Sequence, residues 1–510
     1  MAKRMTETDA QPRRILGAWL TLGLAVLGAL TAAPLLSAQE PNALDAALTL
    51  EKVVVDAVQR AEKSVVAIAR VRNDGPALAP GTTLLPPLVP RFSGEASAGH
   101  RLPNEFGAGV VIDRQGFILT NYHVLGDPAR NDYYVWVNRR PFKVVSVLKA
   151  AEVKAGDPWT DLAVLKIDAD DLEPIVWGDS KSLKKGQFVI ALGNPYGIAE
   201  DGQVSASWGI IANLDRKVPG ATGRESETGK DTLYHFGGLI QVDAKLNLGT
   251  SGGALVNLKG EMVGLITALG VLDGYEKSLG FAIPVDDVFR RTIETLKTGR
   301  KAEFGFLGVA PEDLKEAERQ RGQQGARVSH VVPGTPAFAA HLQEGDVITR
   351  INDQPVYDRD ALMGELGRQP VGAEVRLTVQ RRGDAGRSAR VVETTAKLTK
   401  KHVTAARPVF SQIKDPRWRG MVVDYATALP PPLLRQVLQS LAPDGCLAVL
   451  DVDRDSPAWK AGLRPGMLVS HVVGRRVTLP EQFFEAVKDQ AGEVRLKVIS
   501  ADNGTVTVQP

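Results

Sequence analysis

Between Phe106 and Pro284 the chain alternates short aliphatic and β-branched runs with Gly, Asn and Asp turns, and it shows little sustained helical periodicity. The runs are Gly109–Asp113, Gly116–Thr120, Tyr134–Val137, Leu162–Ile167, Phe188–Leu192 and Met262–Ala268. Many short strands separated by turn signals indicate an all-β barrel or sandwich. One polar, glycine-rich interruption, Asn213–Gly238, predicts a mobile loop.

Different patterns flank this β-rich region. Residues 44–63 place apolar side chains among charged ones, which predicts an amphipathic helix. Asn73–Pro103 is rich in proline and glycine and predicts a long loop, because proline does not fit a central strand. Val285–Lys297 predicts a helix that leaves the β-rich domain, which we expect to span residues 44–300.

Two later stretches resemble each other. Val328–Ala337 leads into Leu342–Ile348, and Val449–Ala458 leads into Ala461–Val469. In both, a strand precedes a Ser/Thr-Pro-Ala helix start, and a glycine precedes the next strand. The sequence therefore predicts one module that occurs twice, over residues 301–400 and 410–510.

The N-terminal segment predicts export. Lys3, Arg4, Arg13 and Arg14 precede the uncharged stretch Ile15–Ala33, whose 19 residues are just long enough to span a bilayer as a helix. A basic flank keeps the N-terminus in the cytoplasm and sends the remaining chain across. Residues 1–38 are then either a signal peptide cleaved after Ala38 or a signal anchor, with the remaining chain in the periplasm.

Composition excludes several function classes. The formal net charge is only +3 and no long basic block occurs, which argues against nucleic-acid binding. The single cysteine, Cys446, can form neither an intramolecular disulfide nor a Cys-based zinc site. The seven histidines are scattered and no HExxH motif occurs. We therefore expect neither a metal nor an organic cofactor.

The segment Gly249-Thr-Ser-Gly-Gly253 has the composition of a nucleophile turn. Flanking glycines allow a tight turn that exposes a serine hydroxyl and aims N–H groups at a developing oxyanion. The segment also satisfies the G-x-S-x-G pattern of α/β-hydrolases, in which the acid and the histidine follow the serine. Here a candidate histidine, His123, and a candidate acid, Asp161, both precede Ser251. That order is the one found in chymotrypsin-like proteases.

With these residues in view, the chain resembles the HtrA (Deg) family of exported trypsin-like serine proteases with two PDZ domains. The matching segments cover the chain from about residue 44 to its end and are Gly107–Asp113, Ile118–His123, Asp161–Lys166, Ala191–Gly197, Gln241–Ala244, Asn247, Gly249–Leu255 and Gly280–Pro284. The resemblance implies a mainly β fold, in which a chymotrypsin-like double β-barrel protease domain is followed by two PDZ-like α+β modules.

The resemblance also implies catalytic roles. Ser251 would be the nucleophile, His123 would accept and return its proton, and Asp161 would orient the imidazole. Backbone N–H groups of Gly249 and Ser251, together with Thr250, would form the oxyanion hole. The family usually has Asn where Thr250 stands, and Asn247-Leu248 also departs from its pattern.

Substrate binding follows from the same resemblance. Leu246 and Leu279 would line the pocket for the residue before the scissile bond, with Leu269 nearby. Thr267–Gly270 would be the edge that pairs with the substrate backbone. Because these walls are apolar, we expect a preference for aliphatic residues such as Val, Ala or Ile.

In the first PDZ-like module, Phe306, Leu307, Gly308 and Val309 match the loop whose amides receive a C-terminal carboxylate while the peptide adds a strand. In the second module Trp418-Arg-Gly-Met421 puts Arg419 where an apolar residue is usual. This poorer match suggests a structural or assembly role.

The expected function is that of an ATP-independent serine endopeptidase that degrades unfolded or damaged proteins in the cell envelope. Expected partners are unfolded polypeptides, hydrophobic C-terminal peptides at the first module, and copies of the chain in a homotrimer or larger oligomer. A second hypothesis is a chaperone or scaffold with weak or no proteolysis.

Overall fold

The computed structural model describes residues 43–72, 105–137, 147–194, 204–217, 232–247, 249–267, 280–383, 390–404, 409–499 and 504–510. The chain divides into the units Met1–Lys52 and Val53–Pro510. The described residues of the first unit are helical and exposed, and they begin α1 (Ala43–Ala61). No described helix has the length and apolar character needed to cross a membrane; the predicted segment Ile15–Ala33 and the loop Asn73–Pro103 lie outside these ranges.

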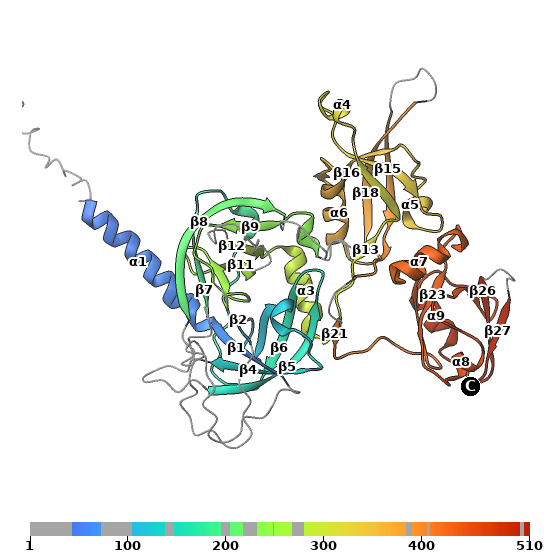
Figure 1. The fold of residues 1–510 in the computed structure, drawn as a ribbon, viewed down its shortest axis with the longest axis horizontal. Helices are drawn as coiled ribbons and strands as arrows, with labels where there is room; N and C mark the ends of the chain where they lie inside the picture. Colours follow the sequence, from blue (N-terminus) through green and yellow to red (C-terminus); the bar gives the residue numbers. More distant parts are fainter. Residues whose placement is uncertain are drawn as a thin grey trace, which may run out of the picture. The chain divides into compact units, whose positions relative to one another are not determined.

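Six strands of the second unit form a first barrel (Figure 1). Its order is β5-β4-β1-β2-β3-β6, and an additional β5–β6 pairing closes the ring. The strands are β1 (Val65–Arg72), β2 (Glu105–Val111), β3 (Phe117–Asn121), β4 (Asn131–Val137), β5 (Val147–Asp157) and β6 (Leu162–Ile167). The short helices η1 (Glu62–Ser64) and α2 (Tyr122–Leu125) precede β1 and follow β3, respectively.

Six further strands form a second closed barrel in the order β10-β11-β12-β9-β8-β7. They are β7 (Phe188–Gly193), β8 (Ser205–Arg216), β9 (Leu239–Val242), β10 (Ala254–Val256), β11 (Met262–Thr267) and β12 (Gly280–Pro284). The prediction of one loop over Asn213–Gly238 was wrong at both ends. Strand β8 continues to Arg216, and Leu233–His235 form the 3₁₀ helix η5, in which Leu233 and Tyr234 are buried.

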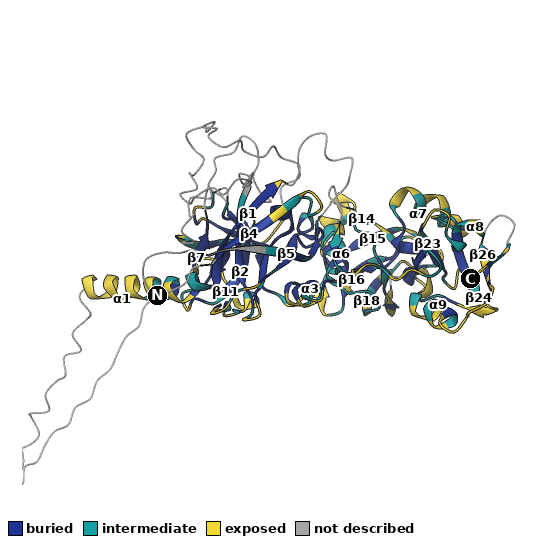
Figure 2. Cartoon of the chain, turned by 90° about the horizontal axis from the view of Figure 1, so that it is seen from below, coloured by how far each residue is buried: buried dark blue, intermediate teal, exposed yellow. Residues whose placement is uncertain are grey.

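One apolar core joins the two barrels. It contains Leu119 and Leu162 from the first barrel together with Ile190 and Leu192 from the second. The helix α3 (Asp287–Lys297) contributes to the same core, and its N-cap Asp286 accepts a hydrogen bond from the N–H of Phe289 at 2.8 Å. Figure 2 shows that the strands of this region are largely buried. The turns between the strands are therefore anchored to a closely packed apolar core.

Two smaller sheets with identical strand arrangements follow. The first has the order β14-β15-β16-β18-β19, and β17 pairs with β16; the second has the order β22-β23-β24-β26-β27, and β25 pairs with β24. Each sheet has its own apolar core. The predicted internal repeat is thus present as a repeated topology.

The first sheet and its helices comprise β13 (Gly305–Phe306), β14 (Val309–Asp313), α4 (Glu316–Arg319), β15 (Ala326–Val331), α5 (Pro336–Ala339), β16 (Val347–Ile351), β17 (Gln354–Pro355), α6 (Arg359–Arg368), β18 (Glu374–Arg381), β19 (Arg390–Lys397) and β20 (Thr399–Lys400). The second comprises β22 (Met421–Tyr425), η6 (Ala426–Ala428), α7 (Pro431–Val437), η7 (Leu438–Ser440), β23 (Leu447–Val452), α8 (Pro457–Lys460), β24 (Leu468–Val472), β25 (Arg475–Arg476), α9 (Pro480–Val487), β26 (Val494–Ile499) and β27 (Thr505–Val508).

The segment between the two sheets returns to the first barrel. Strand β21 (Phe410–Ser411) pairs with β5, with Phe410 opposite Gly156 and Ser411 opposite Ala155. Beside it, Lys301 forms an ion pair with Asp415 at 2.5 Å. The predicted fold class, a mainly β chymotrypsin-like double barrel followed by PDZ-like sheets, is confirmed, and the α/β-hydrolase alternative is excluded.

Candidate active site

His123 and Asp161 meet at one end of the first barrel. His123 lies in α2, directly after β3, and Asp161 lies in the turn that joins β5 to β6. The Nδ1 atom of His123 is 2.8 Å from Oδ2 of Asp161, and the backbone N–H of His123 donates to Oδ1 at 3.0 Å. Both carboxylate oxygens therefore contact the same residue, which fixes the plane of the carboxylate relative to the imidazole.

The backbone of Asp161, like its side chain, is fixed by hydrogen bonds. Its φ of 54° lies in the left-handed region that few non-glycine residues adopt. Its carbonyl oxygen accepts from the N–H of Tyr122 at 3.0 Å and from Nδ2 of Asn121 at 3.3 Å. The residues before His123 thus position Asp161, because β3 and β6 are neighbouring antiparallel strands.

A second carboxyl group, Asp157, begins the same turn. It accepts hydrogen bonds from the N–H and the Oγ1 of Thr160 at 3.0 and 2.5 Å. Burial raises the pKa of Asp157 to about 6, although the bonds from Thr160 act in the opposite direction. The nearby charge of Asp161 raises this pKa further. The turn therefore carries one carboxyl group that takes up a proton in mildly acidic solution.

Ser251 comes from the second barrel, in the turn before β10. Gly249 and Gly252 flank it with φ values of 91° and 85°, which favour glycine. The carbonyl oxygen of Thr250 accepts from the N–H of Gly253 at 2.9 Å. Because a planar peptide unit directs its C=O and N–H in opposite directions, the N–H of Ser251 points away from that bond.

The N–H of Thr250, by contrast, is already used. It donates to the carbonyl oxygen of Asn247 at 3.1 Å, and the Thr250 hydroxyl donates to the same oxygen at 2.6 Å. The prediction that Thr250 shares the oxyanion hole does not fit this arrangement. Among the backbone hydrogen bonds of the described residues, neither Gly249 nor Ser251 is a donor.

Two glycines bring the Ser251 turn against the first barrel. The N–H of Ala108 donates to the carbonyl oxygen of Ser251 at 2.8 Å. A Cβ atom on Gly252 would lie 2.1 Å from the carbonyl oxygen of Ala108. A Cβ atom on Gly107 would lie 2.6 Å from Cγ1 of Val124, next to His123, and 3.5 Å from the carbonyl oxygen of Ser251. The serine turn and the helix that carries His123 therefore both pack against the face of Gly107 from which a Cβ atom would project.

Thr267 links the barrels directly at the acid. Its Oγ1 atom donates to Oδ2 of Asp161 at 3.3 Å, and the residue is only 2% exposed. The sequence predicts that Thr267 begins the edge that pairs with the substrate backbone beside the pocket. Its side chain is buried against Asp161, and residues 268–270 of the predicted edge lie outside the described residues. No local signal in the sequence points to this contact, because 106 positions separate the two residues.

Of the three leucines predicted for the substrate pocket, Leu246 lies within the described residues, whereas Leu269 and Leu279 lie outside them. Leu246 is half-buried and packs against the core of the second barrel. A Cβ atom on Gly280 would lie 2.5 Å from Cδ1 of Leu246. The leucine side chain thus covers the beginning of β12.

The predicted carboxylate loop, Phe306–Val309, has three consecutive carbonyl groups turned into the fold. They accept from Thr399 Oγ1 at 3.4 Å, from the N–H of Ala337 at 2.8 Å and from the N–H of Val332 at 3.0 Å. The N–H groups of Leu307, Gly308 and Val309 share peptide planes with these carbonyls and therefore point outward. Successive outward N–H groups form an anion-binding concavity.

The second sheet repeats this loop with one change. The carbonyls of Arg419 and Gly420 accept from the N–H groups of Ala458 and Asp453 at 3.1 and 2.7 Å, as in the first sheet. Here, however, the N–H of Met421 donates to the carbonyl oxygen of Trp418 at 3.0 Å. Met421 corresponds to Val309, so one of the three outward donors is consumed. Arg419 also bonds outside the loop, to the carbonyl of Gln490 at 3.0 Å.

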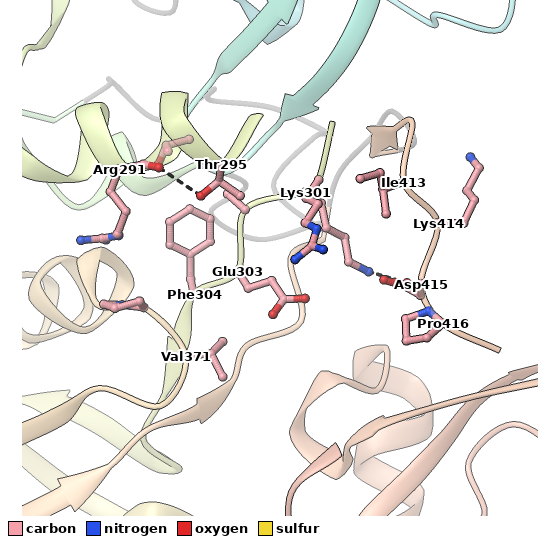
Figure 3. Close-up of a pocket in the computed structure, with 14 residues that line it drawn as sticks. Arg291, Thr295, Lys301, Glu303, Phe304, Val371, Ile413, Lys414, Asp415 and Pro416 are labelled. Atoms are coloured by element: carbon pink, nitrogen blue, oxygen red, sulfur yellow. Dashed lines mark hydrogen bonds and ion pairs between the residues drawn. The ribbon is translucent and has the colours of Figure 1, made fainter. Parts of the chain in front are cut away.

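A pocket of about 630 Å³, lined by both charged and apolar side chains, lies where α3, the segment before β13 and the segment after β21 meet (Figure 3). Lys301 and Asp415 face each other across one side of it, and Phe304 lies between α3 and Glu303. None of the residues predicted for catalysis lines this pocket. Among the described residues, no group of three or more His, Cys, Asp or Glu side chains is placed to hold a metal ion.

Comparison with known proteins agrees with this geometry. The model of a trypsin-like peptidase domain matches residues 107–265, and that of a PDZ domain matches residues 305–391. The chain is 35% identical over 282 residues to a "Probable serine protease do-like" of Buchnera aphidicola, and the match spans about half of each protein, 54%. It is 31% identical to a "Probable periplasmic serine endoprotease DegP-like" of Pseudomonas putida, over 76% of this chain and 75% of that protein.

One solved structure, "HtrA-type protease AlgW with tripeptide", is 26% identical with a TM-score of 0.50 and covers 70% of this chain and 99% of that chain. Fold, site and family models define a trypsin-like serine endopeptidase with a PDZ domain. The chain belongs to the family of the DegP-like serine endoproteases.

Sequence reasoning missed one residue at this site besides the role of Thr267. Trp159, in the turn before Asp161, is only 2% exposed, and its Nε1 donates to the carbonyl oxygen of Gly367 at the end of α6. The sequence signal that could have pointed to Trp159 is a tryptophan two positions before a candidate catalytic acid. Its partner could not be found from the sequence, because 208 positions separate the two residues.

Proposed function

We propose that this protein is an ATP-independent endopeptidase of the periplasm that degrades unfolded or damaged proteins with Ser251 as the nucleophile, His123 as the general base and Asp161 as the orienting acid. The observation that carries the proposal is the double contact of Asp161 with His123, through Nδ1 and through the backbone N–H. That arrangement serves to hold an imidazole in one tautomer.

The proton inventory supports this assignment. An ionised Asp161 can only accept, so Nδ1 of His123 carries the proton and Nε2 keeps its lone pair. Nε2 then takes the proton of Ser251 as Oγ attacks the carbonyl carbon of the scissile bond. The imidazolium that forms is stabilised by Asp161, and it returns the proton to the leaving amine. Water repeats the sequence on the acyl-enzyme and releases Ser251.

The N–H groups of Gly249 and Ser251 are proposed as the oxyanion hole. Thr250 is left out, because its N–H already donates to Asn247. Instead, the two bonds from Thr250 to Asn247 stiffen the turn, so its donors need not reorganise when the oxyanion forms. We further propose that Leu246, Leu269 and Leu279 favour an aliphatic residue before the scissile bond.

The two PDZ-like modules are proposed to have different roles. The first, residues 301–400, binds the C-terminal carboxylate of hydrophobic peptides at Phe306–Val309, which the three outward N–H groups support. The second, residues 410–510, serves structure or assembly, since Met421 donates within its own loop. The protease domain is proposed to span residues 44–300. We also propose that the chain assembles into trimers or larger homo-oligomers. Residues 1–38 are proposed to be either a cleaved signal peptide or a membrane anchor.

The test is degradation of reduced casein without ATP by the chain from residue 39 onward. Ser251→Ala is expected to lower turnover by about 10⁶-fold, the scale for losing a triad nucleophile. Thr250→Ser is the matched control in the same turn; it keeps the hydroxyl that bonds Asn247, so turnover should stay within a few-fold of the unaltered chain. Casein cleavage that survives Ser251→Ala would refute the assignment. Suppression of casein aggregation without cleavage by any form would favour a scaffold instead.

A further inference from the structure

Strand β14 is an exposed edge of the first PDZ-like sheet. It ends the strand order, pairs among the described strands only with β15, and has no buried residue (Figure 2). An exposed edge offers a row of outward N–H and C=O groups to which an extended peptide can add as a further strand. The outward groups of β14 therefore determine what the edge can hold.

Hydrogen bonds identify which residues face inward. The carbonyl oxygen of Gly308 accepts from the N–H of Val332, and that of Ala310 accepts from the hydroxyl of Ser329 at 2.9 Å, so both face β15. Successive residues of a strand direct their backbone groups alternately to its two sides. Val309 therefore faces the outer edge. A β-bulge follows Ala310, and Pro311 lies opposite Val328, whose N–H and C=O bond to Asp346 and Gly345 on the far side of β15. Pro311 thus belongs to a pair without hydrogen bonds to β15, and it also faces the outer edge.

Pro311 has no N–H group, so the outer edge lacks the donor that follows Val309. A peptide whose carboxylate lies against the N–H groups of Leu307, Gly308 and Val309 would place its C-terminal residue opposite Val309. In an antiparallel pair the next bonded position lies two residues along each strand. The third residue from the peptide's C-terminus would thus lie opposite Pro311, and its carbonyl oxygen would find no donor.

We propose that Pro311 limits ligand recognition by the first PDZ-like module to the terminal carboxylate and the last two residues of a peptide, without extended strand addition. This inference rests on the proposed peptide-binding role of the loop. The proline ring also occupies the direction from which that third carbonyl would approach. Residues farther from the C-terminus then contribute little to affinity. The module accepts many newly exposed C-termini that share only their last residues.

The second sheet provides an internal contrast. At the position of Pro311 it has Val423, which carries an N–H group, but all five residues of its edge strand β22 are buried. Its loop also has one outward N–H group fewer, because the N–H of Met421, which corresponds to that of Val309, donates to the carbonyl oxygen of Trp418. Of the two corresponding edge strands, the exposed one, β14, is therefore the one that carries the proline, and proline is a common way to keep an exposed edge from pairing with other strands.

The test compares peptide length in the full chain carrying Ser251→Ala, which prevents hydrolysis. Calorimetry would measure binding of an acetylated dipeptide, Ac-Val-Leu, and of a hexapeptide that ends in the same two residues. With Pro311 present, we expect the two dissociation constants to agree within about threefold. Pro311→Ala should tighten hexapeptide binding about tenfold, which corresponds to about 1.4 kcal/mol, and leave the dipeptide unchanged.

Two controls separate this effect from general loosening of the sheet. Pro355→Ala changes a proline of β17, which pairs only with β16, and should affect neither peptide. A hexapeptide with an ester in place of the amide after its third-last residue has a weaker acceptor there, so it should lose most of the gain from Pro311→Ala.

Tighter binding of the hexapeptide than of the dipeptide by tenfold or more with Pro311 present would overturn the inference. So would a Pro311→Ala variant that binds both peptides unchanged. If neither form binds a free carboxylate better than an amidated hexapeptide, both the inference and the proposed carboxylate site fail. The casein assay tests the protease independently of these results.

Discussion

The indole Nε1 of Trp159 donates a hydrogen bond to the carbonyl oxygen of Gly367 at 3.0 Å. Trp159 lies in the turn that ends at Asp161, and Gly367 lies near the end of α6 in the first PDZ-like module. The indole ring also contacts Phe236 and Phe304, with centroid separations of 6.1 and 6.3 Å. A Cβ atom on Gly367 would lie 2.8 Å from Cζ2 of Trp159. The turn that carries the proposed catalytic acid is therefore packed against the first PDZ-like module.

Trp159→Phe should destabilise this contact. The change removes the indole N–H that donates to Gly367 and leaves a small void, which together cost about 2 kcal/mol of unfolding free energy. Scanning calorimetry would measure the shift of the transition that contains the protease domain. Trp208→Phe is the matched control, because Trp208 is 54% exposed and stacks on Phe188 at the surface. Equal shifts for the two variants would contradict the prediction.

Thr267→Val should lower catalytic efficiency without weakening substrate binding. The hydroxyl that supports Asp161 is lost while the side-chain volume is kept. We expect kcat to fall about tenfold, the scale of one hydrogen bond to a charged group, with KM unchanged. Thr267→Ser keeps the hydroxyl and should retain most of the activity. If the valine variant is as active as the serine variant, Thr267 has no positioning role.

Gly107→Ala should disturb the packing between the serine turn and α2. The new methyl group would lie 2.6 Å from Cγ1 of Val124, an overlap that costs about 1–3 kcal/mol when a well-packed site cannot expand. Casein turnover should fall because His123 follows any movement of α2. Val124→Ala removes the clashing methyl groups, so the double variant should recover part of the turnover lost in Gly107→Ala. Absence of any recovery would locate the effect elsewhere.

Asp157→Asn should alter how stability depends on pH. The pKa of Asp157 is raised from 3.8 to about 6, so the folded chain retains a proton that the unfolded chain releases between these values. The contribution of Asp157 to stability is therefore greatest below pH 4, declines as the pH rises to about 6, and stays constant above that.

Because the asparagine variant lacks this decline, its stability relative to the unaltered protein should increase from pH 4 to pH 6, by at most about 3 kcal/mol. Thermal midpoints at several pH values would measure the difference. Asp170→Asn, which changes an exposed carboxylate, should give a profile parallel to that of the unaltered protein. A parallel profile for Asp157→Asn as well would show that burial of this carboxyl group has no such effect.

The sequence by itself determined the architecture and the chemical class. Short β-branched runs between turn residues predict strands because each run is local, and the helices over 44–63 and 285–297 have periodicities that need no distant partner. The order of His123, Asp161 and Ser251 and the glycines around Ser251 also lie in short segments. Such features are readable because backbone conformation and residue type are coupled within a few positions.

Only the tertiary structure decided which groups those segments actually use. Thr267 reaches Asp161 from the other barrel, Trp159 reaches Gly367 in another module, and Phe410 pairs with β5 after a long excursion of the chain. The sequence gives no sign that the N–H groups of Thr250 and Met421 are unable to bind a ligand, yet both donate to carbonyl oxygens within their own turns. These outcomes depend on how separate elements pack and on where each hydrogen bond goes, which no local pattern specifies.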